Sequence, residues 1–509
     1  MFFRREKLKK ELRKKDPGEK QKECSGTKSL FKRIGAAFLL VATFNGCSLD
    51  LLGERVPDSF MDTTAEGIAN DTPNDILNDI PNEVFDPEVP TDVPEAEDVR
   101  EVSDTEVPTD VPEAEDTCES SEETPDIPAE LDTAPDVPED TAAEEAPAII
   151  TFERTFGGPA EDAATSVQQT TDGGYIVSGY TRSSGAGGWD AWLIRLYAEG
   201  DIEWDNTYGG SGNDRAFSVQ QTTDGSYILG GYINSNNVYI VKTDGGGTEL
   251  WNRVFNFAYH DVAYSIVEAA DGGYVATGST ELSSIDVDAW ALKLNINGDE
   301  VLWQRTYGGS NFDVARQIQR TADGRYIIAG FTHSFGAGGR DAWLIKLYAD
   351  GTMEWDDTFG GSSLDTAYSG QQTTDGNYIL AGFTQSYGAG EDDAWVIKTD
   401  SGGSPWNRTF GGPAVDRAFS IYQTSDGGYI LSGDTTSFGA GEEDAWVIKL
   451  DADGNEMWST TFGGSNSERA SSIQQTADGG YITAGFTYSF GAGGSDAYVI
   501  KTDENGNVD

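Results

Sequence analysis

The sequence predicts an all-β fold for residues 150–509, a seven-bladed β-propeller of four-stranded blades. Two observations predict it: a phrase of the form DGGY-I-x-x-G recurs seven times, and each copy lies in a unit with four strand-like segments. Successive copies are 52, 47, 52, 52, 51 and 52 residues apart, and a period of this size indicates one structural unit repeated. The copies are marked by Tyr175, Tyr227, Tyr274, Tyr326, Tyr378, Tyr429 and Tyr481.

The sixth unit shows how the four strands are predicted. Segments 417–424, 429–433, 444–450 and 457–462 are rich in β-branched and aromatic residues, and turns with Gly and Asp separate them. Four strands per unit of about 50 residues, repeated around an axis, are typical of propeller blades. Eleven of the twelve tryptophans occupy two positions of the unit, and we expect them to pack between blades. They are Trp192, Trp204, Trp251, Trp290, Trp303, Trp343, Trp355, Trp395, Trp406, Trp446 and Trp458.

The two ends of the repeat region predict that the ring closes on itself. The last unit stops after its third strand, 498–502, and lacks the fourth. A copy of that fourth strand, 150–156, precedes the first unit, and Phe152 stands where Trp458 stands in its own unit. The N-terminal strand can therefore complete blade seven, which removes two open sheet edges.

Residues 1–46 predict a basic region followed by a signal peptide. Residues 1–33 hold 13 Lys/Arg, and an apolar run of 11 residues follows at 34–44. Eleven residues are too few to span a bilayer, which needs about 20. A basic flank before a short apolar core is typical of a secretory signal. An ordinary buried segment is the alternative interpretation.

Residues 47–149 predict a disordered acidic stalk. Residues 48–149 hold 33 Asp/Glu, 2 Lys/Arg and 13 of the 17 prolines, and segment 88–98 recurs word for word at 106–116. Such a segment cannot bury enough apolar surface to offset the cost of ordering. Its expected role is to hold the propeller off a membrane surface. Docking to a basic partner is the alternative.

Two resemblances follow from these residues. Phe44-Asn-Gly-Cys47 resembles a bacterial lipobox, which implies that Cys47 carries lipid, detectable as palmitate. Units of the form W-x-x-T-[FY]-G-G…D-G-G-Y-I…G-A-G-x-x-D-A-W resemble a largely uncharacterised family of secreted or lipid-anchored bacterial and archaeal propeller repeats, over about residues 150–509. A looser likeness links Asp451-x-x-Gly454-x-x-x-Trp458 to quinoprotein-type propellers. The resemblance implies an extracytoplasmic lipoprotein, at the outer membrane or cell surface.

Charge limits the possible partners. Residues 150–509 hold 19 Lys/Arg and 49 Asp/Glu, a net charge of −30. Nucleic-acid binding needs a positive footprint, so we expect no nucleic-acid partner and no membrane contact except through the lipid anchor. A protein or polysaccharide ligand remains, and we expect a monomer. The propeller contains no cysteine, and Cys118 is a lone thiol in the stalk.

A ring of acids is the first candidate site. In each unit an acidic residue stands at the same position before the first strand, and Ca²⁺ prefers six to eight oxygen ligands. Ca²⁺ is therefore the one cofactor we consider. The alternative is that each carboxylate accepts backbone N–H bonds and fixes its own turn. The ring consists of Asp162, Asp214, Asp261, Asp313, Asp365, Asp416 and Glu468.

The second candidate site consists of residues that depart from the repeat. Unit two shortens a loop to 234–237, and unit three has 256–260 where the others have Gly-Gly. The departures predict a ligand-binding patch over blades one to four, and neutral drift of degenerate repeats is the alternative. The candidates are Trp189, Phe257, Tyr259, His260, His333 and Arg340.

Function is predicted less sharply than fold. The repeat region has two histidines in different units, no zinc spacing and no nucleophile or phosphate-loop motif, so we assign no catalytic residue. The predicted function is a cell-envelope lipoprotein that displays the propeller as a binding or scaffold module. The alternatives are an enzyme at the channel mouth, either a quinoprotein dehydrogenase or a polysaccharide-cleaving enzyme, and a purely structural surface protein.

Overall fold

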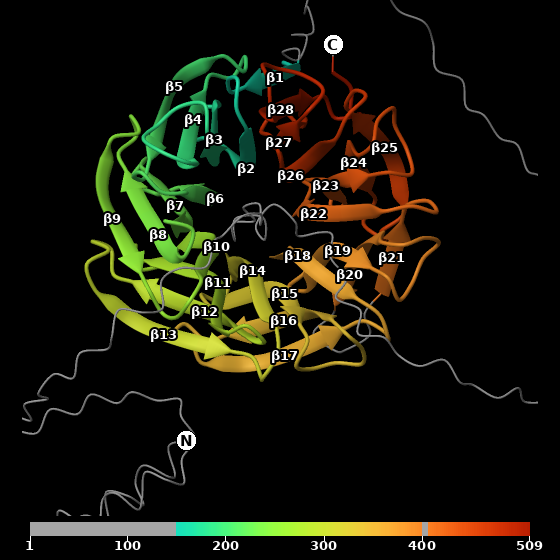
Figure 1. Cartoon of the computed structure of the whole chain (residues 1–509). Coiled ribbons are helices and arrows are strands. Elements are labelled where there is room, and N and C mark those ends of the chain that lie inside the picture. Colours follow the sequence, from blue (N-terminus) through green and yellow to red (C-terminus); the bar gives the residue numbers. More distant parts are fainter. Residues whose placement is uncertain (1–148, 400–405, 509) are drawn as a thin grey trace, which may run out of the picture. The chain divides into compact units, whose positions relative to one another are not determined.

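The computed structural model describes residues 149–399 and 406–508, in which every regular element is a β-strand. The strands form seven four-stranded antiparallel sheets arranged around a central axis (Figure 1). The predicted seven-bladed β-propeller is thus confirmed. None of these residues forms a helix that could cross a membrane. The predicted signal region, Cys47 and the acidic stalk lie outside the described residues.

Each blade runs from an inner strand near the axis to an outer strand (Figure 1). The inner strands are β2 (Asp162–Gln169), β6 (Arg215–Gln221), β10 (Asp261–Glu268), β14 (Asp313–Arg320), β18 (Asp365–Gln372), β22 (Asp416–Gln423) and β26 (Glu468–Gln475). The second strands are β3 (Tyr175–Thr181), β7 (Tyr227–Ile233), β11 (Tyr274–Ser283), β15 (Tyr326–Thr332), β19 (Tyr378–Thr384), β23 (Tyr429–Thr435) and β27 (Tyr481–Thr487). The third strands are β4 (Asp190–Leu196), β8 (Asn237–Thr243), β12 (Asp286–Leu294), β16 (Asp341–Leu347), β20 (Asp393–Thr399), β24 (Asp444–Leu450) and β28 (Asp496–Thr502). The outer strands are β5 (Ile202–Tyr208), β9 (Glu249–Phe255), β13 (Val301–Tyr307), β17 (Met353–Phe359), β21 (Trp406–Phe410), β25 (Glu456–Phe462) and β1 (Phe152–Phe156).

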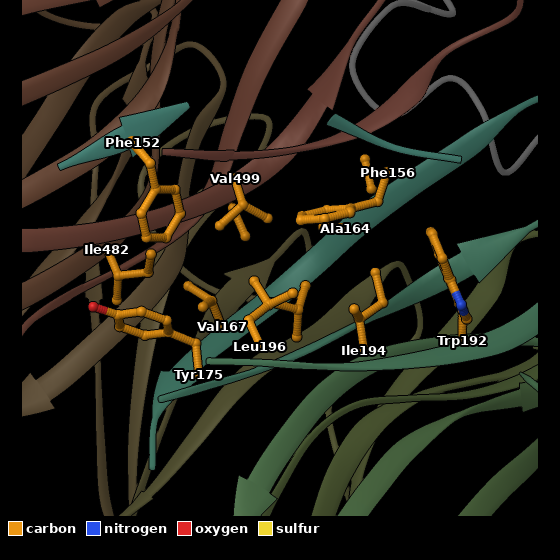
Figure 2. Packing of buried hydrophobic residues seen from close by; sticks show 13 residues of the cluster. Phe152, Phe156, Ala164, Val167, Tyr175, Trp192, Ile194, Leu196, Ile482 and Val499 are labelled. Atoms are coloured by element: carbon orange, nitrogen blue, oxygen red, sulfur yellow. The ribbon is translucent and has the colours of Figure 1, made fainter. Parts of the chain in front are cut away.

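The N-terminal strand closes the ring as predicted. β1 is the outer strand of blade seven and pairs antiparallel with β28, with Phe152 opposite Lys501. Figure 2 shows Phe152 pointing into a cluster that contains Ile482 and Val499 from blade seven and Tyr175 from blade one. The Phe152 ring lies against Gly200 in the next blade, just as the outer-strand tryptophans lie against the corresponding turn glycines.

The core is divided among the contacts between neighbouring blades. Buried side chains form seven clusters, each built from the facing strands of two adjacent sheets. Third-strand tryptophans such as Trp290 and Trp343 are almost completely buried, and outer-strand tryptophans such as Trp303 and Trp458 pack against the clusters from the side. The predicted role of the repeated tryptophans is confirmed. Large rings bury much apolar surface each, so they dominate the cohesion between blades.

The last glycine of the repeated phrase is explained by a close approach between strands. Every inner strand has a register shift near its start, for example between Ala164 and Ser166 in β2. At this bulge the backbone of the inner strand presses against Gly179 of the second strand, where a Cβ would overlap the carbonyl oxygen of Ala163. The same overlap would occur in all seven blades, so the bulge requires glycine there.

Candidate functional site

The propeller has two faces that differ in their loops. One face carries the loops that join second to third strands and outer strands to the next inner strand; we call it the upper face. The opposite face carries the turns that join first to second strands and third to outer strands; we call it the lower face. The inner strands begin at the upper face and end at the lower face. Residues that start an inner strand, follow a second strand or precede a third strand therefore gather at the upper end of the axis.

The lower face is the same in every blade. An aspartate of the DGGY turn pairs with a Lys or Arg on the third strand at 2.6–3.5 Å in all seven blades. The cationic side chains are mostly buried, and Lys501 is completely buried. Burial alone would raise the pKa of Asp426, but Thr424 and Lys449 lower that pKa to about 2. The lower face is thus a set of structural ion pairs.

The predicted ring of acids lies at the upper face and is completely buried. Each of the seven carboxylates accepts a hydrogen bond of 2.5–2.8 Å from the backbone N–H four residues before it. Asp313 also accepts bonds from the hydroxyls of Thr332 and Ser334, at 2.5 and 2.6 Å. These bonds fix the loops between blades. Among residues 149–399 and 406–508 no group of three or more His, Cys, Asp or Glu is placed to hold a metal ion.

Blade three departs from this regular bonding. In the other long loops the acid that starts the third strand accepts N–H bonds from its Gly-Ala-Gly loop, as Asp341 does from Gly338 at 3.1 Å. Blade three has a tight β11–β12 hairpin instead, and one oxygen each of Asp286 and Asp288 is buried with no hydrogen-bond partner. Burial, Asp286 and Asp313 raise the pKa of Asp288 to about 6. The raised pKa of Asp288 could not be predicted from the sequence, because Asp288 stands at the same repeat position as the acids of the other blades.

Trp189 is buried rather than exposed, with 8% of its surface accessible. Its ring lies 4.0 Å from the guanidinium carbon of Arg215 and 4.9 Å from that of Arg182, and edge-on to Tyr180 at 6.3 Å. Trp189 lies in the loop just before β4, and its ring packs against neighbouring side chains instead of facing solvent. It holds Arg215 of the next blade in place.

The blade-three candidates divide between packing and exposure. Phe257 packs edge-on against Trp290 with ring centroids 5.2 Å apart, so it belongs to the core. His260 lies 6.3 Å from the ring of Tyr232, and burial lowers the pKa of His260. Tyr259 is 74% exposed, more than any other large apolar or aromatic side chain among the described residues. Of the three, only Tyr259 is freely accessible to a partner.

His333 and Arg340 lie together in blade four. Arg340 Nε donates to His333 Nε2 at 3.1 Å, and the Arg340 guanidinium carbon lies 4.5 Å from the ring centroid of Phe331. Burial and the charge of Arg340 lower the pKa of His333 to about 4. His333 is therefore neutral at pH 7, with the proton on Nδ1, and accepts from Arg340. The six predicted binding residues form three separate groups around the upper face.

A row of side chains at the inner-strand bulges was missed by the sequence analysis. We call this row the axial row; it consists of Thr165, Phe217, Tyr264, Arg316, Tyr368, Phe419 and Ser471. Neighbours in the row touch: the Phe217 and Tyr264 centroids are 5.5 Å apart, and those of Tyr368 and Phe419 are 5.0 Å apart. The row is aromatic or basic over blades two to six and small and polar at blades seven and one. It breaks the seven-fold symmetry next to the axis.

Arginines accompany the axial row at the upper end of the inner strands. Arg417 pairs with Asp392 at 2.7 Å, and Arg469 pairs with Asp434 at 2.9 Å. Arg215 stacks on Trp189 and on Tyr180, whose centroid is 4.2 Å from its guanidinium carbon. The same position holds no lysine or arginine in blades one, three, four and five. Comparing each inner-strand position across the seven units would have revealed this variation.

One hollow of about 430 Å³ opens beside blade four. It is lined by Phe335, Trp343, Met353 and the carboxylates Asp356 and Asp357, among others. Trp343 Nε1 donates to Asp356 at 2.9 Å, as Trp192 does to Asp205 in blade one at 3.0 Å. The Trp–Asp hydrogen bond beside the hollow recurs in blade one, so this bond is a feature of the repeat.

Comparison with known proteins finds similar chains among solved structures alone. No protein-family model and no curated protein matches the chain. Among solved structures, the Neurospora crassa Pan2 WD40 domain is similar with a TM-score of 0.43 and 11% identity, over 70% of this chain and 96% of that one. A protein of unknown function from Dyadobacter fermentans has a TM-score of 0.40 and 12% identity, over 69% and 98%. Quinohemoprotein alcohol dehydrogenase from Comamonas testosteroni has a TM-score of 0.36 and 11% identity, over 66% of each chain.

Proposed function

We propose that this protein is a cell-envelope lipoprotein that displays its propeller as a binding or scaffold module for a protein or polysaccharide partner. One observation carries the proposal. Seven of the nine aromatic side chains that the described residues expose lie in upper-face loops. The seven are Tyr259, Phe312, Phe335, Tyr387, Phe438, Tyr488 and Phe490. Exposed aromatics gathered on one face are typical of interaction surfaces.

The upper face also differs from blade to blade, whereas the lower face repeats. A partner that is itself asymmetric needs such differences in order to dock in one orientation. The shortened loop of blade two contains Asn234 and Ser235, whose φ angles are 55° and 64°. The exposed Tyr259 lies in the neighbouring blade three. The upper loops of blades two and three therefore form the part of the face that we assign to the partner.

Attachment to the envelope is proposed from the lipobox-like segment at Cys47. Labelling with a palmitate analogue in a bacterial host is expected to mark the wild-type chain and to leave Cys47→Ser unmarked. Equal labelling of both chains would contradict the anchor. The upper face would then still be available for binding in a secreted form.

Binding is tested by probing protein and glycan arrays with the full chain. Any partner found is expected to bind Tyr259→Ala at least about tenfold more weakly, because exposed aromatic anchors dominate contact energies. The matched control is Tyr197→Ala, which removes an aromatic side chain 50% exposed on the lower face. Equal weakening by both variants, or turnover of an arrayed compound, would contradict a binding module at the upper face.

A further inference from the structure

Two arginines near the axis have no acidic partner in a strongly acidic propeller. Among residues 149–399 and 406–508, Arg316 makes no hydrogen bond and no ion pair, and its contacts are with aromatic rings. Arg340 bonds to His333 and, at 3.4 Å, to the hydroxyl of Thr366, but to no carboxylate. The corresponding region of blades six and seven instead pairs each arginine with an aspartate.

Both guanidinium groups are held in fixed positions. Arg316 lies between two rings of the axial row, with its guanidinium carbon 4.5 Å from the centroid of Tyr264 and 5.4 Å from that of Tyr368. The Arg340 guanidinium is held by the bond from its Nε to His333 at 3.1 Å and by the ring of Phe331, 4.5 Å from its central carbon. Stacking holds a planar guanidinium by its faces and leaves the N–H donors at its edge free for a ligand.

The two groups lie close to each other. Both guanidinium carbons are near the ring of Phe331, at 5.7 Å for Arg316 and 4.5 Å for Arg340. Burial is the main cause that lowers the pKa of Arg340; the charge of Arg316 lowers that pKa further, and Tyr368 and Asp392 oppose the shift. An anion bound between the two guanidinium groups would relieve the repulsion between their charges.

The surroundings hold polar groups that lack partners. Nε of Arg316 and the hydroxyl of Tyr368 are buried and without a hydrogen-bond partner. His333 offers no competing positive or negative charge, since it is neutral and its Nε2 is occupied by Arg340. Buried polar groups without partners are rare in stable proteins, and a bound ligand is one way to satisfy them.

We propose that Arg316 and Arg340 form a binding site for a carboxylate group at the upper end of the axis, between blades four and five. The flat, forked guanidinium matches a carboxylate in two parallel hydrogen bonds. The net charge of −30 repels multiply charged anions, so a singly charged carboxylate is favoured over phosphate. The inference rests on the proposed binding role of the upper face and names the chemistry that it recognises.

Calorimetry with the full chain tests the site. The probes are galacturonate as a sugar acid, the α-amide of N-acetylglutamate as a singly charged mimic of an acidic peptide side chain, inorganic phosphate, and neutral galactose. We expect at least one carboxylate probe to bind the wild type, and Arg316→Gln and Arg340→Gln to weaken it about tenfold or more. The matched control is Arg305→Gln, which removes the same charge from an exposed position on β13.

The carboxylate probe that binds identifies the source, a sugar acid or an acidic peptide. Arg316→Lys keeps the charge and loses the fork, so it is expected to bind more weakly than wild type and to weaken further as salt is raised. Circular dichroism of each variant separates lost binding from lost folding. Failure of every carboxylate to bind, binding of phosphate alone, or equal binding by all variants would overturn the site. The upper-face role would survive each of these results if an arrayed partner still depends on Tyr259.

Discussion

The lower and upper faces of the propeller are made by the same strands but are organised differently. On the lower face of all seven blades, an aspartate forms an ion pair with a buried Lys or Arg, and the seven pairs are similar. On the upper face a constant ring of buried acids fixes the loops, while the side chains beside it change from blade to blade. The difference teaches that the groups repeated in all seven blades build the ring, and that the side chains that vary beside the acid ring distinguish one blade from the next.

Both faces exist only if the ring of blades is closed. Removing the closing strand β1 is therefore expected to lower stability more than any other change considered below. Deletion of residues 150–156 removes the buried rings of Phe152 and Phe156 and opens an edge of β28. We expect the free energy of unfolding to fall by more than about 4 kcal/mol, since a single buried Phe lost from a core costs about 3–5 kcal/mol. Urea denaturation measures it. An unchanged midpoint would contradict closure by β1.

The second test compares a glycine at the inner-strand bulge with a glycine whose surroundings are open. Gly433→Ala is expected to cost about 2–3 kcal/mol, because its Cβ would overlap the carbonyl oxygen of Arg417 at the bulge. The matched control is Gly210→Ala, where a Cβ meets nothing within 4 Å, and we expect less than about 0.5 kcal/mol there. Thermal denaturation of both variants decides. Similar losses would mean that the bulge tolerates a side chain.

Opposite responses to pH sharpen the comparison between the faces. On the upper face the pKa of Asp288 is raised to about 6, so its ionisation costs stability as pH rises from about 4 to 6. Asp288→Asn is therefore expected to gain about 1–2 kcal/mol at pH 7, less than the shift itself implies because the side chain is partly solvated.

On the lower face the pKa of Asp426 is lowered to about 2, so its contribution is present above pH 4 and is lost as pH falls towards 2. Asp426→Asn is expected to cost about 1 kcal/mol at pH 7, since the aspartate is half exposed and screened. Unfolding curves at pH 4, 5.5 and 7 measure both variants. A loss of stability in Asp288→Asn at pH 7 would show that its buried oxygen has a partner after all.

Calcium is expected to have the smallest effect. Every carboxylate of the acid ring already accepts a backbone N–H bond inside a buried loop, so an ion would have to displace those bonds. We expect the melting temperature to change by less than about 1 °C between calcium and chelator. A gain of about 2.7 kcal/mol at a hundredfold excess over the dissociation constant would establish a calcium site instead.

The fold could be predicted because the same four-strand pattern occurs seven times in the sequence. The period of the tyrosines gave the number of blades, and the orphan strand at 150–156 gave the closure. The close approach at Gly179 and its counterparts explains why the phrase is so constant: the bulge allows no other residue. A constant phrase records a local geometric requirement, which a sequence shows directly.

The candidate site could be predicted only in part. Trp189 departs from the repeat, but its burial depends on Arg215, which lies in the next blade and follows it by 26 positions. The unpaired state of Arg316 and Arg340 depends on which acids of other blades come within hydrogen-bond reach; Arg417, in contrast, pairs with Asp392 of the preceding blade. Pairing is a property of side-chain geometry across blades, and no spacing along the chain encodes it.

The pairing of β1 with β28 also sets a sequence of events in time. The Tyr498 hydroxyl donates to Glu153 over a separation of 345 residues, so the first strand of the propeller to be synthesised meets its partner last. Closing so long a loop costs conformational entropy before any contact returns it, which makes this step slow. During synthesis β1 therefore has no partner until β28 has been made. The ring can therefore close only after β28 is available to pair with β1.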